Sequence, residues 1–225
     1  MDADTVLYRN ADEVNSAMGR VYGHMGLAVS ISMLVSYYVG SSPELLKFFF
    51  TGIMKWIVIL APLAAILVMT FAQAKFSKTG LQLFLYGFAG LMGLSFATIF
   101  AVFTMGSIFT AFMGAAVLFC TLSFYGYFTK KNLDSLGQFM FVGLIAIVIA
   151  SIVNIFIGST VMQMVISAIA IIVFLGLTAY DTQKIREIVS VENEDGRAEV
   201  MGALNLYLDF INLFLSLLNL FGDKK

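Results

Sequence analysis

Two aspartates in the hydrophobic C-terminal half are the residues best suited to do chemistry. Asp181 closes the apolar stretch 169–180, and Asp209 opens the next one, 206–220. An ionisable side chain inside a membrane span is costly and usually marks an ion or proton pathway. Their role therefore depends on whether the stretches around them cross a membrane.

A close pair of carboxyls has restricted chemistry. Two carboxylates at hydrogen-bonding distance in a dry site cannot both ionise cheaply, so they share one proton at low or neutral pH. At higher pH the pair carries two charges and either repels itself or recruits a hard cation such as Ca²⁺, which takes about six to eight oxygen ligands. Asp181 and Asp209 are thus candidates for a proton sensor and for a Ca²⁺ site. A buried, satisfied carboxyl with a structural role is the alternative.

Composition indicates a membrane protein. The chain has 225 residues, of which 60% are hydrophobic and 12% charged, whereas soluble domains carry about 25% charged residues. No Asp, Glu, Lys or Arg occurs in residues 79–129 or 135–180. Each run is about twice the ~20 residues that cross a bilayer as a helix. Each run therefore predicts a hairpin of two membrane spans.

The whole pattern predicts an all-α integral membrane protein with seven spans in one domain, residues 17–222. A cytoplasmic N-terminal tail, residues 1–16, precedes this domain, and a short C-terminal tail, residues 223–225, follows it. The expected helices lie near residues 17–39, 53–73, 80–103, 106–128, 137–158, 162–182 and 203–221.

The basic residues predict the orientation of the chain, because cytoplasmic segments are enriched in Lys and Arg. With the N-terminus inside, nine of the 13 basic residues fall in inner segments. We therefore expect a multi-pass protein of the cell (inner) membrane with a cytoplasmic N-terminus and a C-terminus on the opposite side. If the last span is re-entrant, the C-terminus returns to the cytoplasm instead.

Polar residues follow one stripe of the last predicted helix, separated alternately by four and three residues. Such a stripe on a membrane helix is typical of a water-accessible seam that lines a pathway. Interhelical hydrogen bonding is the alternative, since Asn and Ser commonly join membrane helices. The stripe consists of Asn205, Asp209, Asn212, Ser216 and Asn219.

Other polar residues give weaker signals. His24 is the only histidine, and we expect it to be uninvolved in function. The acidic 187–199 segment is expected to be a solvated loop. Motifs of metalloproteases, serine hydrolases and P-loop proteins are absent from the sequence, so we expect no enzyme, no tightly bound cofactor and no nucleic-acid partner.

Two segments around the aspartates resemble the signature segments of the Bax inhibitor-1 family. They are Tyr180-Asp181-Thr182-Gln183-Lys184-Ile185 and Leu206-Tyr207-Leu208-Asp209-Phe210-Ile211-Asn212-Leu213-Phe214, and Arg20-Val21-Tyr22 is similar to the family's first-helix start. The resemblance implies six helices around a central seventh and a hydrogen-bonded pair, Asp181 and Asp209, near the cytoplasmic side. It also implies a bacterial-type member that acts as a pH-sensitive Ca²⁺ leak channel, with protons and Ca²⁺ as partners beside the lipid bilayer.

The sequence departs from the family pattern in the second span. Members can carry an acidic residue there, whereas this chain has Leu60-Ala61-Pro62-Leu63, and Lys75 is the best match for the basic residue that latches the pair.

The alternative function is an interaction protein that modulates a membrane-bound AAA protease or a stress response without conducting ions. The acidic N-terminal tail would then be the contact. A proton-coupled transporter is a third interpretation of the same carboxyl pair.

Overall fold

Helices make up nearly all of the structure. The computed structural model describes residues 9–191 and 195–225. Within these ranges it contains no β-sheet, and an isolated bridge joins Phe103 and Lys224. The elements are α1 (Ala11–Gly40), α2 (Pro43–Phe50), α3 (Met54–Ala72), the 3₁₀ turn η1 (Gln73–Lys75), α4 (Lys78–Val102), α5 (Met105–Phe128), α6 (Asp134–Ile157), α7 (Thr160–Ser190) and α8 (Arg197–Phe221).

Each of the seven predicted helices has a counterpart, but three of them are longer than expected. α1 begins at Ala11, α8 begins at Arg197 and α7 ends at Ser190, each about two turns beyond the predicted boundary. The predicted boundaries followed the loss of hydrophobicity. Backbone hydrogen bonding continues through polar residues, so these helices extend past their apolar segments. Residues 11–16, predicted as tail, therefore belong to α1.

The short helix α2 was not predicted. Ser42 caps it by accepting a hydrogen bond from the backbone of Leu45, and Pro43 occupies its first turn. Serine followed by proline is a typical helix start, so the local signal was present. α2 is bent by 102° from α1, and the two helices together form one bent apolar unit.

Most helices are suited to a lipid environment. Six of them, α3 to α8, are long and apolar enough to cross a membrane, and α1 and α2 qualify together as a seventh, broken span. Large apolar side chains such as Phe71, Phe139 and Phe156 are more than 70% exposed on the outer surface, which suits lipid as the surrounding solvent. The predicted class, an all-helical multi-pass membrane protein, is confirmed.

Short polar signals set where the helices begin. Asn10 and Glu13 form a capping box at the start of α1, in which each side chain bonds to the other residue's backbone N–H. Ser77, Thr104 and Ser159 each accept a backbone hydrogen bond at the first turn of α4, α5 and α7. These caps satisfy N–H groups that a helix cannot satisfy internally.

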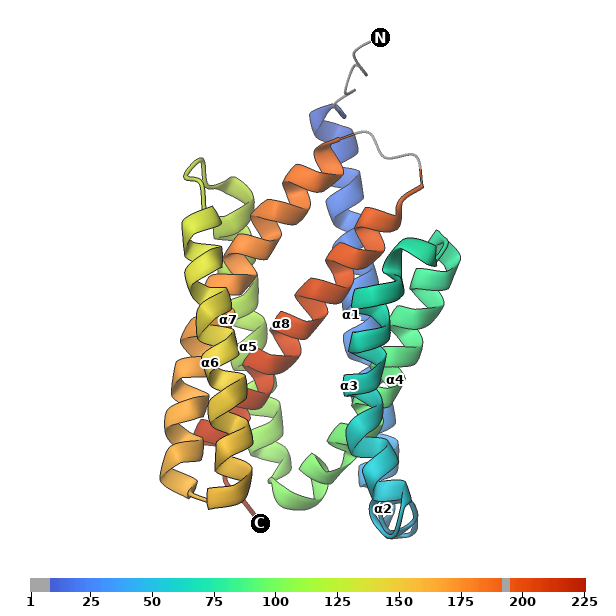
Figure 1. Ribbon diagram of the computed structural model, residues 1–225, viewed down its shortest axis with the longest axis vertical. Coiled ribbons are helices and arrows are strands. Elements are labelled where there is room, and N and C mark those ends of the chain that lie inside the picture. The colour runs from blue at the N-terminus through green and yellow to red at the C-terminus, as the bar shows by residue number, and fades with distance from the viewer. Residues whose placement is uncertain (1–8, 192–194) are drawn as a thin grey trace.

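α8 lies at the centre of the bundle and crosses it obliquely (Figure 1). In its most apolar 18-residue stretch 72% of the residues are buried, against 11 to 33% in the other five full-length spans. The prediction of a central seventh span is therefore confirmed. Because most of α8 is surrounded by protein, its buried polar groups must find their partners inside the bundle.

Two glycines let neighbouring helices approach closely. A Cβ on Gly93 of α4 would lie 2.5 Å from the backbone oxygen of Ser32 on α1, and a Cβ on Gly126 of α5 would overlap the backbone of Ala179 on α7. Small residues at such crossings are typical of helix packing in membranes. These contacts join the outer helices that surround α8.

The last residues of the chain are fixed to the corner between α4 and α5. The backbone N–H of Thr104 donates to the carbonyl of Asp223 at 3.1 Å, and that of Lys225 donates to Val102 at 2.9 Å. The Lys225 ammonium also donates to the carbonyl of Phe100 at 2.7 Å. Residues 223–225, predicted as a short tail, are thus bound to the bundle at the end opposite the start of α1 (Figure 1).

We predict that Gly93→Ala lowers stability while Gly90→Ala does not. The new methyl at position 93 must push α1 and α4 apart, and overpacking of this kind costs about 1–3 kcal/mol. At Gly90, on the same helix, an added methyl would meet no atom within 4 Å, so the substitution there adds only helix propensity. The thermal unfolding midpoints of both variants, purified in one detergent, measure the difference. Equal midpoints would contradict the close contact.

Candidate proton-sensing site

The two predicted aspartates meet between α7 and α8. The side chains of Asp181 and Asp209 lie close enough for each carboxyl to influence the protonation of the other. Asp209 is only 5% exposed, and Asp181 is partly buried. A hydrogen bond between two carboxyl groups needs a proton on one of them, because an ionised carboxylate is an acceptor only. The contact is therefore compatible with a pair that holds one proton.

In the part of the chain that the structure describes, two buried side-chain atoms have no hydrogen-bond partner, one on Arg197 and one on Asp209. Within the described residues, the Oδ2 atom of Asp209 is buried and has no hydrogen-bond partner. A buried, unpartnered acceptor is costly and is usually explained by a functional role or by a bound water or ion. In this bundle the unpartnered acceptor lies on the carboxyl pair itself, which makes the pair the candidate site for a proton or a cation.

The pair lies well inside both helices. Asp181 is nine residues before the end of α7 and Asp209 is twelve residues after the start of α8. At 1.5 Å per residue, the carboxyls lie about 14 and about 18 Å from these helix ends.

The residues next to Asp181 fix α7 against three other elements. Tyr180 packs its ring over Gly137 of α6, and the hydroxyl of Thr182 is 2.8 Å from that of Ser123 on α5. Gln183 accepts a hydrogen bond from the backbone of Leu133 at 2.9 Å, just before α6. With these neighbours held on three sides, the Asp181 side chain has one direction left, toward α8.

Contacts on either side of Asp209 hold α8 in register. Gly202 faces Ile185 of α7 so closely that a Cβ would lie 2.8 Å from its side chain. The hydroxyl of buried Tyr207 is 2.7 Å from that of Ser32 on α1. Phe210 packs edge-on against Phe112 of α5, with ring centroids 5.4 Å apart. These contacts place Asp209 on the α7 side of the central helix.

The predicted polar stripe on α8 divides into a buried middle and exposed ends. Asn205 and Asn219 are exposed. Asn212 donates to the carbonyl of Leu208 at 2.8 Å, and Ser216 donates to that of Asn212 at 2.7 Å. Both side chains thus bond to their own helix. Their oxygens keep lone pairs that can accept a further hydrogen bond or face a cation.

Lys75, the predicted basic latch, is exposed in η1. Across residues 9–191 and 195–225, no ion pair or hydrogen bond joins it to Asp181 or Asp209. Arg197, at the start of α8, is the basic residue that contacts this turn, and it donates to the carbonyl of Gln73 at 2.7 Å. The structure therefore does not bring Lys75 and the carboxyl pair together.

A second buried acid on α8 was missed by sequence reasoning. Glu199, expected in a solvated loop, has a side chain only 3% exposed and forms a fork of two hydrogen bonds with Arg20 of α1, at 2.8 and 2.7 Å. Arg9 and Lys78 approach the same carboxylate at 3.7 and 3.9 Å. The expectation was wrong because α8 starts earlier than its apolar segment and carries Glu199 under α1.

His24 is linked to a polar group on α4. Its Nδ1 atom is 2.6 Å from the hydroxyl of Tyr86. Among the described residues, no hydrogen bond or ion pair joins this His24–Tyr86 contact to the carboxyl pair.

Among the described residues, no group of three or more His, Cys, Asp or Glu side chains is placed to hold a metal ion. The pair alone therefore offers two carboxylates and needs water or carbonyl oxygens to complete a Ca²⁺ shell.

Fold and site together define a multi-pass helical membrane protein with a carboxyl pair buried against its central helix. The sequence model of the family described as inhibitor of apoptosis-promoting Bax1 matches residues 14–225. The chain therefore belongs to this family, and the resemblance inferred from the two aspartate segments is confirmed.

Bacterial relatives are similar to the chain over nearly its full length. The inner membrane protein YbhL of Escherichia coli strain K12 is 37% identical over 214 residues, which cover 92% of each chain. The protein YrjE of Lactococcus lactis is 35% identical over 232 residues, covering 98% of this chain and 96% of the relative. The match of whole chains indicates that the bundle described here is shared with these proteins.

We predict that Glu199→Gln destabilises the protein. The substitution keeps the shape of the side chain but removes the charge that faces Arg20, and hydrogen bonds to charged groups contribute about 1.5–3 kcal/mol. Because the Arg20 side chain is 48% exposed, solvent screening places the expected loss toward the lower end. The thermal unfolding midpoint measures the effect.

Glu187→Gln is the matched control. Glu187 also forms an ion pair, with Lys184 at 3.0 Å, but both side chains are substantially exposed. Exposed pairs contribute little to stability, so this midpoint should stay near that of the parent protein. The Glu199 cluster consists of Glu199, Arg20, Arg9 and Lys78. If the two variants lose stability equally, this cluster stabilises the fold no more than an exposed ion pair does.

Proposed function

We propose that the protein is a membrane leak pathway for cations, with Ca²⁺ as the candidate ion, and that the Asp181–Asp209 pair gates it in response to protons. The observation that carries this proposal is the close approach of the two carboxyls between α7 and α8, together with the buried oxygen of Asp209 that has no hydrogen-bond partner. A purely structural carboxyl would be expected to satisfy both oxygens inside the bundle.

The direction of gating follows from the charges. With one proton shared, the pair holds α7 and α8 together through a hydrogen bond and carries a single negative charge. When the proton leaves, two negative charges lie at contact distance in a medium of low dielectric constant, where their repulsion is far larger than in water. The helices then separate or a cation enters between them. Raising the pH should therefore open the pathway and lowering it should close it.

Ca²⁺ enters this scheme as cargo rather than as a resident ligand. Two carboxylates supply charge, while water and the oxygens of Asn212 and Ser216 on the same face of α8 can supply transient ligands. A site with few fixed ligands binds weakly, and conduction requires binding weak enough for the ion to leave. In the proposed pathway Asn205 and Asn219 mark the two ends of the stripe.

The proposed location is the inner membrane with a cytoplasmic N-terminus, as for a relative whose name places it there. Arg9 and Arg20 lie toward the start of α1, whereas Lys225 lies at the other end of the bundle (Figure 1). Because basic residues favour the cytoplasmic side, the end of the bundle that holds the Glu199 cluster would face the cytoplasm.

We predict that Asp181→Asn and Asp209→Asn each abolish the pH dependence of Ca²⁺ flux. An amide has the shape of a protonated carboxyl and cannot ionise, so neither variant can reach the doubly charged form of the pair. In the parent protein, the fraction of molecules in which both carboxyls of the pair are ionised rises with pH. Below the pH at which the shared proton is lost, this rise is up to about tenfold per pH unit. Uptake of ⁴⁵Ca²⁺ into proteoliposomes between about pH 6 and about pH 8 should show this rise for the parent and a flat, low flux for both variants.

Asp134→Asn is the control for a general charge effect. Asp134 is an exposed acid at the start of α6, paired with Lys184 at 3.2 Å, and the variant should retain the parent pH profile. Unchanged profiles in both pair variants would remove the gating role. If the parent protein shows no flux but binds a membrane-bound AAA protease, the interaction role predicted from the acidic N-terminal residues would replace it.

A further inference from the structure

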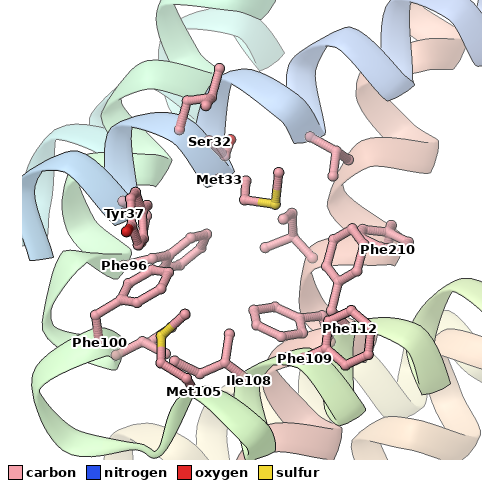
Figure 2. Close-up of a pocket in the computed structure, with 16 residues that line it drawn as sticks. Ser32, Met33, Tyr37, Phe96, Phe100, Met105, Ile108, Phe109, Phe112 and Phe210 are labelled. Carbon is pink, nitrogen blue, oxygen red and sulfur yellow. The ribbon is translucent and has the colours of Figure 1, made fainter. Parts of the chain in front are cut away.

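A large apolar cavity lies between α1, α4, α5 and α8. Its volume is about 310 Å³, and Figure 2 shows the side chains that surround the open space. Aromatic and aliphatic groups form most of the wall. Examples from the four helices are Met33, Phe96, Ile108, Phe112, Phe210 and Ile211.

Water is a poor occupant of this cavity. A buried water molecule needs about two to four polar partners, and the wall offers only the hydroxyls of Ser32, Ser36 and Tyr37. The Ser32 hydroxyl already bonds to the carbonyl of Ala89 at 2.8 Å and to Tyr207 at 2.7 Å. An occupant of hydrocarbon character fits the remaining surface.

The cavity opens sideways, toward the lipid. Several of its wall residues are also exposed on the outer surface of the bundle: Leu34 is 63% exposed, Phe109 67% and Met105 54%. These residues belong to α1 and to the start of α5, so the opening lies between these two helices. In a membrane this opening faces the acyl region of the bilayer rather than water.

The size of the cavity suits a narrow apolar occupant. Its volume of about 310 Å³ is close to the lower limit of about 300 Å³ for small-molecule pockets. A flexible hydrocarbon chain can adapt its shape to such a space.

We propose that this cavity binds the acyl chain of a membrane lipid, inserted from the side between α1 and α5. The three arguments are the apolar wall, the opening at membrane depth and a volume that suits a flexible chain. The bilayer supplies such chains at high local concentration. The site does not depend on the leak proposal, since it rests on the cavity alone.

The bound chain would contact the central helix next to the carboxyl pair. Phe210 and Ile211 line the cavity and directly follow Asp209 in the sequence. Ser32, another wall residue, holds the hydroxyl of Tyr207 on the preceding turn of α8. An acyl chain in the cavity therefore supports the segment of α8 that carries Asp209, and its influence on gating, unlike its binding, rests on the proposed function.

Photolabelling of the full-length protein tests the site. The probe is a phosphatidylcholine with a diazirine near the end of one acyl chain, incorporated into nanodiscs, and labelled residues are located by peptide mass spectrometry. We expect labelling of cavity residues such as Ile108 and Met33 to exceed, by several-fold, labelling of Phe139 on α6, which is 72% exposed to lipid. Labelling that merely follows surface exposure would overturn the proposal.

Variants that fill the cavity supply the second test. Ile108→Trp should lower labelling of the remaining cavity residues several-fold, whereas Ile152→Trp, on the lipid-facing side of α6 and 52% exposed, should leave it unchanged. Thermal midpoints of both variants show whether they fold, and the labelling pattern of the parent protein remains decisive if Ile108→Trp does not. Labelling of the cavity by hydroxyl radicals from water, or cross-links to a second copy through it, would also overturn the acyl-chain site.

Discussion

Burial of the central helix among other helices is the constraint on which the site depends. A buried polar group on α8 reaches neither water nor lipid headgroups, so its partners must come from the bundle. Two acids on this helix meet the constraint in different ways. Glu199 is surrounded by Arg20, Arg9 and Lys78, whereas Asp209 faces a second acid, Asp181. The first acid is stabilised as an anion, and the second needs a proton.

In the proposed function, α8 therefore has one end that ion pairs hold in place and one contact, at Asp209, that depends on the shared proton. Glu199 and Asp209 are ten residues apart, which corresponds to about 15 Å along the helix. The Glu199 cluster ties the start of α8 to α1 and α4 at any pH where its carboxylate is ionised. In the proposed function, loss of the shared proton frees the Asp209 region to move while the start of α8 stays in place.

The segment around Asp181 that carries the family resemblance also joins several helices. Tyr180, Thr182 and Gln183 link α7 to α6, to α5 and to the connection between them, which aims Asp181 at α8. The signature thus has two parts with separate physical roles. Neutral side chains build the support, and in the proposed function the carboxyl holds the shared proton. Next to Asp209, Phe210 and Ile211 of α8 line the apolar cavity, so in the proposed lipid site an acyl chain becomes part of the environment of this helix.

The sequence by itself determined the membrane class and the apolar spans, and it singled out Asp181 and Asp209 as candidate site residues, because hydrophobicity and the cost of burying charge are local properties of a residue and its neighbours. Tertiary structure alone decided that these two carboxyls touch, that Glu199 is enclosed by cations and that Lys75 stays apart from the pair. It also created the cavity and the bent α1–α2 unit. These features depend on helix length and crossing, where contacts between residues far apart in the sequence outweigh the hydrophobic pattern of any one segment.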